Sequence, residues 1–158
     1  MMVGQAVEPG HFDRRDFLKM TGAGAMVLTM TPFAAEATPE MVTEALAKVL
    51  GNKKFKDGRI KITLPEIAEN GAAVAMRVAV DGPMTADDHV TAIHMFSEGN
   101  PLPYIGSYRL SPRNGKAEIS LRIRLAQSQK IVVAAETSKG ETFLARQGIK
   151  VTLGGCGG

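Results

Sequence analysis

Apolar and polar residues alternate strictly over residues 117–125, and this pattern constrains the fold more than any other feature of the chain. Because successive side chains of a β-strand point to opposite faces of a sheet, a period of two predicts a strand with one buried and one solvent-facing side. The same alternation recurs over residues 60–64 and 74–80. The apolar members of the clearest run are Ala117, Ile119, Leu121, Ile123 and Leu125.

Further strand patterns and turn signals extend this arrangement through the chain. Strands are expected over residues 89–97 and 104–111, around Val132, and over residues 142–153. Gly, Pro, Asn and Ser form turn signals at 81–83, 99–103, 111–115 and 138–141. Short strands at regular spacing are typical of a sandwich, and 158 residues make one domain. The prediction is an all-β, immunoglobulin-like antiparallel β-sandwich of about seven strands.

A short helix is predicted before these strands, over residues 39–50. Thr38 is a suitable N-cap, Pro39 suits the first helical position, and Gly51 is a plausible end. The apolar residues recur at helical spacing, so one side of the helix must pack on its own domain or on a partner. These residues are Met41, Val42, Ala45, Leu46, Val49 and Leu50.

The first 37 residues have the three-part layout of an export signal. Arg14 and Arg15 precede Phe17-Leu18-Lys19, a string that resembles the twin-arginine signal. A weakly apolar stretch follows, too short to span a bilayer, and Ala35 and Ala37 form an A-x-A cleavage pattern. We therefore expect residues 1–37 to be removed after folded export to the periplasm. Residues 38–153 would then form the folded domain, followed by an arm at 154–158.

Charge and cysteine content exclude several classes of protein. The net charge is only +3, with no dense basic stripe and interleaved aromatics, so no nucleic-acid partner is expected. No membrane-spanning segment is expected either. A disulfide scaffold within the chain is excluded because there is one cysteine.

That cysteine lies in the last five residues, Gly154-Gly155-Cys156-Gly157-Gly158. Four glycines without apolar neighbours predict a flexible arm with an exposed thiol. No His or cation adjoins Cys156 to activate it, so it is poorly suited to act as a nucleophile alone. We predict a non-catalytic chain in which Cys156 is a covalent attachment point that other proteins' active sites activate.

The ending Lys-Val-Thr-Leu-Gly-Gly-Cys-Gly-Gly resembles the SoxY family, the sulfur-compound carriers of the bacterial thiosulfate-oxidising (Sox) pathway. The segment Asn100-Pro101-Leu102-Pro103-Tyr104-Ile105 is similar to the family's Asn-Pro-x-Pro stretch. The resemblance implies that Cys156 carries thiosulfate-derived S-thiosulfonate and persulfide intermediates and that Gly154, Gly155, Gly157 and Gly158 supply reach. It implies no cofactor of the chain's own.

The resemblance also implies a set of partner proteins. A SoxZ-like β-sandwich subunit would form a heterodimer with the chain. The enzymes would be a SoxXA-like c-type cytochrome, a SoxB-like dimanganese hydrolase and a SoxCD-like sulfane dehydrogenase. We expect an apolar face of one sheet, together with the helix over 39–50, to meet the SoxZ-like subunit.

Other interpretations of the residues stay open. A periplasmic β-sandwich that binds copper or another redox metal would use His89, His94 and Met95, although alternation places His94 on the opposite face from the other two. A lesser alternative is an interaction protein in which Cys156 forms an intermolecular disulfide. The basic run of residues 53–59 is either a solvated loop or a docking site for an anionic partner.

Overall fold

In the computed structural model, the described residues are 38–155, and they begin with the helix α2, Pro39–Leu50. The Thr38 side chain accepts a hydrogen bond from the Met41 amide at 3.4 Å, and Gly51 ends the helix with a φ of 68°. Proline at the helix start and glycine with positive φ at its end follow the usual capping preferences. The observed bounds match the predicted helix. Within residues 38–155, none of the helices has the length and apolar character needed to cross a membrane.

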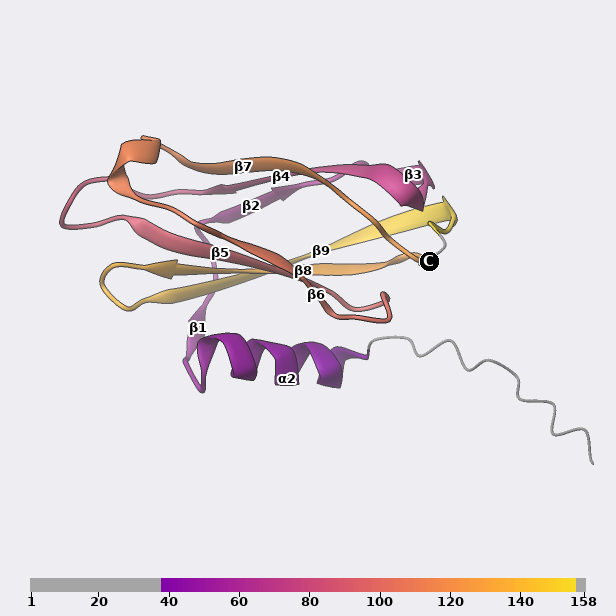
Figure 1. The fold of residues 1–158 in the computed structure, drawn as a ribbon, viewed down its shortest axis with the longest axis horizontal. Helices are drawn as coiled ribbons and strands as arrows, with labels where there is room; N and C mark the ends of the chain where they lie inside the picture. The colour runs from indigo at the N-terminus through magenta and orange to yellow at the C-terminus, as the bar shows by residue number, and fades with distance from the viewer. Residues whose placement is uncertain (1–37, 156–158) are drawn as a thin grey trace, which may run out of the picture. The chain divides into compact units, whose positions relative to one another are not determined.

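Nine strands follow α2 among the described residues (Figure 1). Two single turns of 3-10 helix, η1 and η2, interrupt them at Gly71–Ala73 and Pro112–Asn114. The strands are β1 Phe55–Lys56, β2 Ile60–Thr63, β3 Ile67–Asn70, β4 Val74–Val80, β5 Val90–Ser97, β6 Tyr104–Arg109, β7 Ala117–Ile123, β8 Gln129–Thr137 and β9 Thr142–Leu153.

The strands form two sheets, as predicted for a sandwich. The larger sheet has the order β1-β9-β8-β5-β6, with β3 also paired to β9, and the smaller sheet has the order β2-β4-β7. The seven predicted strands pair in antiparallel fashion. The other two, β1 and β3, both pair with β9 in parallel, so the prediction of purely antiparallel sheets is wrong at these two positions.

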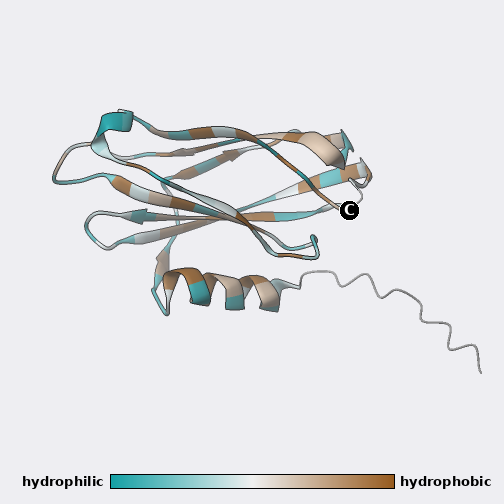
Figure 2. Cartoon of the chain, viewed as in Figure 1, coloured by the Kyte–Doolittle hydropathy of each residue, from teal (hydrophilic) through white to brown (hydrophobic). Residues whose placement is uncertain are grey.

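The main core lies between the two sheets. Met76 and Val78 of the smaller sheet pack with Ile93, Met95 and Val133 of the larger sheet in one buried cluster. The alternation along β4 and β7 places their polar residues on the outer face, and Figure 2 shows this change of hydropathy along the ribbons. The predicted one-sided strands are therefore present in the smaller sheet.

The larger sheet is covered on both faces. Its second face carries Phe96, Val132 and Leu144, which pack with Leu46 and its neighbours on α2 in a separate buried cluster. The central strands β5 and β8 consequently read as nearly continuous buried runs, as strands covered on both sides do.

The apolar side of α2 packs on the chain's own larger sheet. Val42, Leu46 and Leu50 lie against the chain's own sheet, so they are not available for a partner. The outer face of the smaller sheet is polar. Within residues 38–155, the buried side of α2 and the polar outer face of the smaller sheet are therefore not the apolar surface expected to meet a SoxZ-like subunit, and the place of that surface stays a prediction. The exposed large apolar side chains are Met41, Val49, Ile67, Leu102, Tyr104, Tyr108 and Leu153.

Candidate functional site

The predicted attachment site follows directly after the last strand. Cys156, Gly157 and Gly158 lie outside the described residues, whereas Gly154 and Gly155 are described. The end of β9 is held from two sides: it pairs with β3, where Leu153 lies opposite Asn70, and the Val151 amide donates to the Ser128 hydroxyl at 2.8 Å. The chain reaches Gly155 from a firmly paired strand.

The first two glycines of the expected arm make close backbone contacts. Gly155 is buried, and its amide donates a 2.9 Å hydrogen bond to the Leu125 carbonyl. A Cβ added to Gly154 would lie 2.1 Å from the Ala126 carbonyl oxygen, and one added to Gly155 would lie 2.6 Å from the Ala72 amide nitrogen. We expected both glycines to serve as flexible reach. Within residues 38–155 they instead allow the chain to lie tightly against the fold, because only glycine fits there.

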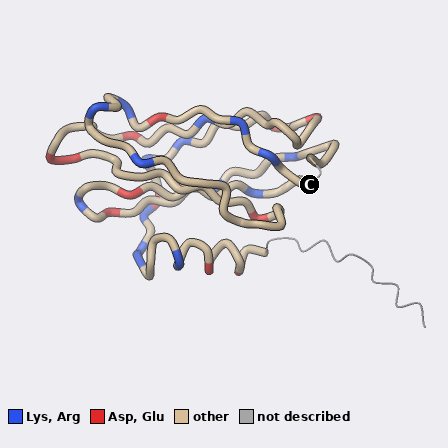
Figure 3. The backbone as a smooth tube through the Cα atoms, viewed as in Figure 1, with Lys and Arg blue, Asp and Glu red and all other residues tan. Residues whose placement is uncertain are grey.

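A cavity of about 490 Å³ adjoins Gly155. Two arginines, Arg122 and Arg124, line it together with the apolar residues Leu102 and Ile105. Figure 3 shows basic residues near the end of β7 and in the segment that follows it. Positive charge therefore lies beside the residue that precedes Cys156.

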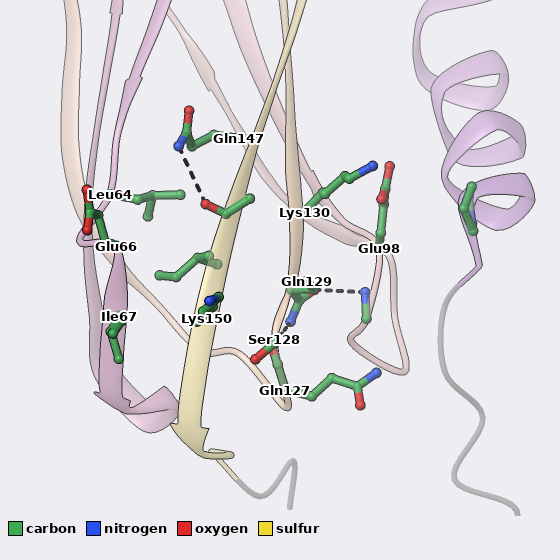
Figure 4. Close-up of a pocket in the computed structure, with 14 residues that line it drawn as sticks. Leu64, Glu66, Ile67, Glu98, Gln127, Ser128, Gln129, Lys130, Gln147 and Lys150 are labelled. Atoms are coloured by element: carbon green, nitrogen blue, oxygen red, sulfur yellow. Dashed lines mark hydrogen bonds between the residues drawn. The ribbon is translucent and has the colours of Figure 1, made fainter.

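A second hollow, of about 750 Å³, lies beside β9 and the start of β8 (Figure 4). Polar side chains line much of it, including Gln127, Gln129 and Gln147, with Lys130 and Lys150. The Gln129 side chain accepts a hydrogen bond from the Gly99 amide at 2.8 Å, drawn as a dashed line in Figure 4. This hollow does not include Gly155 among its lining residues, so it is separate from the cavity at the chain end.

The candidate metal ligands make other contacts. His94 is buried, and its Nε2 lies 3.1 Å from a carboxylate oxygen of Glu136, which also pairs with Lys53. Met95 packs in the core between the sheets, and the His89 ring bonds the Thr85 carbonyl. Across residues 38–155, no three His, Cys, Asp or Glu side chains come together in a way that could hold a metal ion.

Three of the four basic residues in the run over 53–59 pair with a carboxylate of β8 or of the turn after it: Lys53 with Glu136, and Lys56 and Arg59 with Glu141. Lys56 lies 2.5 Å from Glu141, and the Arg59 guanidinium lies 5.0 Å from the centre of the Phe143 ring. These contacts favour a structural role for the run over a docking site.

The family model described as "Sulfur oxidation protein SoxY" matches residues 46–156, which is well over half of the chain. The chain belongs to the SoxY family. Members of this family are sulfur carriers in sulfur oxidation and not catalysts, so the prediction of a carrier rather than an enzyme is confirmed at that level. The family match ends at Cys156.

Solved structures agree with this assignment to the SoxY family. The sulfur carrier protein SoxY from Chlorobium limicola f thiosulfatophilum is 34% identical, with a TM-score of 0.62 over 71% of this chain and 92% of that chain. No match was found among curated proteins.

Two superoxide reductases share the fold of this SoxY family member. The enzyme (neelaredoxin) from Ignicoccus hospitalis is 22% identical, with a TM-score of 0.53 over 74% of this chain and 95% of that chain. A putative superoxide reductase from Thermotoga maritima is 20% identical, with a TM-score of 0.53 over 61% of this chain and 93% of that chain. At this identity the likeness concerns the fold alone.

Proposed function

We propose that this chain carries thiosulfate-derived intermediates covalently on Cys156 during the oxidation of thiosulfate to sulfate. The observation that carries the proposal is the position of the chain's one cysteine, between glycine pairs and directly after the buried Gly155, in a member of the SoxY family. A thiol at the end of a chain can enter a partner enzyme's active site while the folded domain stays outside.

The first step joins thiosulfate to the carrier. The thiol of Cys156 and the outer sulfur of thiosulfate form a disulfide bond, giving Cys–S–S–SO₃⁻, while one proton and two electrons leave. A SoxXA-like c-type cytochrome accepts those electrons. The bond formed is covalent yet remains open to thiol–disulfide exchange, which suits a temporary carrier.

The second step releases sulfate. Water attacks the terminal sulfonate sulfur, and the S–S bond to the sulfonate breaks. Sulfate and two protons are released, and the persulfide Cys–S–S⁻ remains on the carrier. A SoxB-like dimanganese hydrolase performs this step, and a SoxCD-like sulfane dehydrogenase oxidises the remaining sulfur. The proposal assigns the acids, bases and metal ions of these reactions to the partner enzymes.

The proposal includes a location and a companion subunit. Residues 1–37 act as a twin-arginine signal, so the protein folds before export to the periplasm. A SoxZ-like subunit forms the heterodimer and is exported with it, which explains why a folded-state route serves a chain without a cofactor. A mature chain that stays monomeric in the presence of the SoxZ-like subunit contradicts this part.

Intact-mass analysis of the periplasmic protein from thiosulfate-grown cells tests the proposal. We expect a chain that begins at Thr38 and carries an S₂O₃ or sulfur adduct, which reductant removes and which maps to Cys156. Cys156→Ser should carry no adduct and should abolish thiosulfate oxidation, because serine cannot form the disulfide bond.

The control and the contrary outcome are equally direct. The Cys156→Ser chain should reach the periplasm and unfold at the same urea concentration as the native chain, since the last described strand, β9, ends at Leu153. A bare thiol in thiosulfate-grown cells, with a copper ion retained through purification, would favour the metal-binding alternative.

A further inference from the structure

Leu125, just after β7, links the chain end to the rest of the fold. Its carbonyl accepts the hydrogen bond from the Gly155 amide at 2.9 Å, and its own amide donates to the Gly71 carbonyl at 2.8 Å. The Leu125 side chain is fully buried between the sheets, so its backbone is fixed. The last described residue is therefore bonded to a rigid part of the molecule.

Asn100 holds this loop from both sides of Leu125. Its side-chain amide donates to the Arg124 carbonyl at 2.8 Å, and its side-chain oxygen accepts from the Ala126 amide at 2.9 Å. The same oxygen accepts from the Gln129 side chain at 2.9 Å. An asparagine side chain that replaces backbone partners in this way orders a loop that neither sheet reaches.

Gly71 completes the contact from the opposite side. A Cβ at this position would lie 2.2 Å from the Leu125 carbonyl oxygen and 2.7 Å from the Gly155 amide nitrogen. These are the two atoms joined by the hydrogen bond that holds Gly155. Even one methyl group at residue 71 must push that pair aside.

We propose that Asn100 and Gly71 are positioning residues for the sulfur-carrying cysteine, because together with Leu125 they hold Gly155 in place. We call the group Gly71, Asn100, Leu125 and Gly155 the arm anchor. Consecutive Cα atoms lie 3.8 Å apart across a trans peptide. By holding Gly155, the arm anchor therefore fixes the point from which the chain continues to Cys156. The effect of the arm anchor on the transfer of sulfur to Cys156 rests on the proposed function, whereas the arm anchor itself does not.

The arm anchor reduces the cost of presenting the thiol to an enzyme. Ordering one backbone residue costs entropy equivalent to roughly a fivefold to thirtyfold loss of affinity. If Gly154 and Gly155 are already ordered, an enzyme need order only the residues beyond them. Releasing the arm anchor should therefore raise the KM of a partner enzyme for the carrier about fivefold or more, with kcat unchanged.

Amide hydrogen exchange tests the arm anchor without any sulfur chemistry. We expect the Gly155 amide to exchange slowly in the native chain and about tenfold faster in Gly71→Ala, Gly154→Ala and Asn100→Ala. The Val133 amide, on a fully buried residue of β8, is the reference for an intact fold. Gly154 lies outside both sheets, so Gly154→Ala keeps the test valid even if Gly71→Ala fails to fold.

Gly148→Ala and Asn52→Ala are the matched controls. Gly148 lies on the same strand, β9, and a Cβ there meets nothing within 4 Å. Asn52 lies in the exposed segment after α2. Both variants should leave Gly155 protected. A Gly155 amide that is unprotected in the native chain, or equally affected by Gly71→Ala and Gly148→Ala, overturns the inference.

A second experiment tests the functional consequence by measuring the conjugation of thiosulfate to Cys156 by the cytochrome partner. A rise in KM with unchanged kcat in Gly71→Ala, Gly154→Ala and Asn100→Ala, and not in the controls, supports the positioning role. Unchanged KM despite loss of Gly155 protection overturns that role. If even the native chain takes no sulfur adduct while Gly155 stays protected, the proposed function fails and the arm anchor stands.

Discussion

Arg122 and Arg124 are the charged residues that line the cavity at Gly155, the residue that precedes the cysteine expected to meet anionic sulfur compounds. A unit charge about 10 Å from an anion in water changes its local concentration about twofold. We predict that Arg122→Gln and Arg124→Gln each lower the rate of Cys156 alkylation by anionic iodoacetate about twofold at low salt. The rate with neutral iodoacetamide should not change.

The ratio of the two alkylation rates separates attraction of the anion from any change in thiol reactivity. Arg113→Gln is the control. It removes the same charge from η2, which precedes β7, whereas Arg122 lies near the end of β7. The effect should disappear in 1 M salt, where the screening length falls to about 3 Å. Equal ratios in Arg113→Gln and Arg122→Gln would refute the prediction.

At the same scale, the sequence indicates an attachment residue, Cys156, which stays a prediction, but it does not indicate the close backbone contacts of the glycines before it. Glycines near a chain end indicate flexibility, and this interpretation misses the close approach of Gly154 and Gly155 to residues 71, 72 and 126. Asn100 belongs to the Asn-Pro-x-Pro stretch, and that motif alone predicts no structural role for its side chain. Its partners Arg124 and Ala126 are more than 20 residues away, and no local pattern reveals such a pairing.

At the scale of elements, α2 should contribute to stability through its buried side alone. Leu46 packs in the cluster with Phe96, Val132 and Leu144, so Leu46→Ala should lower the free energy of unfolding by about 2–3 kcal/mol. Val49 is on the same helix but 40% exposed, so Val49→Ala should change it by less than about 0.5 kcal/mol. Urea unfolding of both variants checks this, and similar losses would mean that α2 does not pack as described.

Helices and strands with a clear apolar periodicity were predictable from the sequence. Strands that exist only because a neighbouring strand pairs with them were not. The helix over 39–50 and the seven antiparallel strands follow from apolar spacing and turn residues, which act locally. β1 has two residues and β3 has the sequence Ile-Ala-Glu-Asn, so neither shows alternation. Both exist because the long strand β9 offers backbone groups to pair with, a feature of the assembled sheet.

At the scale of the whole molecule, Glu136 connects α2 to the larger sheet. This carboxylate on β8 accepts from Lys53, just after α2, and lies 3.1 Å from His94 on β5. Partial burial would raise the pKa of Glu136, but the hydrogen bonds and charges of Lys53 and His94 outweigh it and hold the pKa below its usual range. The charged carboxylate therefore stabilises the fold.

The sign of this linkage gives a pH dependence of stability. Because the pKa of Glu136 is lower in the folded chain, its contribution is fully present above the ordinary carboxyl value of about 4.3 and is lost as the pH falls through the folded pKa. We predict that Glu136→Gln costs about 1 kcal/mol of unfolding free energy at pH 7, with the difference from the native chain shrinking below about pH 4. Glu44→Gln is the control: it removes a carboxylate that lies exposed on α2 and makes no ion pair within residues 38–155, so it should leave the unfolding free energy at pH 7 unchanged. Urea unfolding from pH 3 to pH 7 decides the matter: a Glu136→Gln difference that persists unchanged at acid pH would mean that the charge on Glu136 does not hold helix and sheet together.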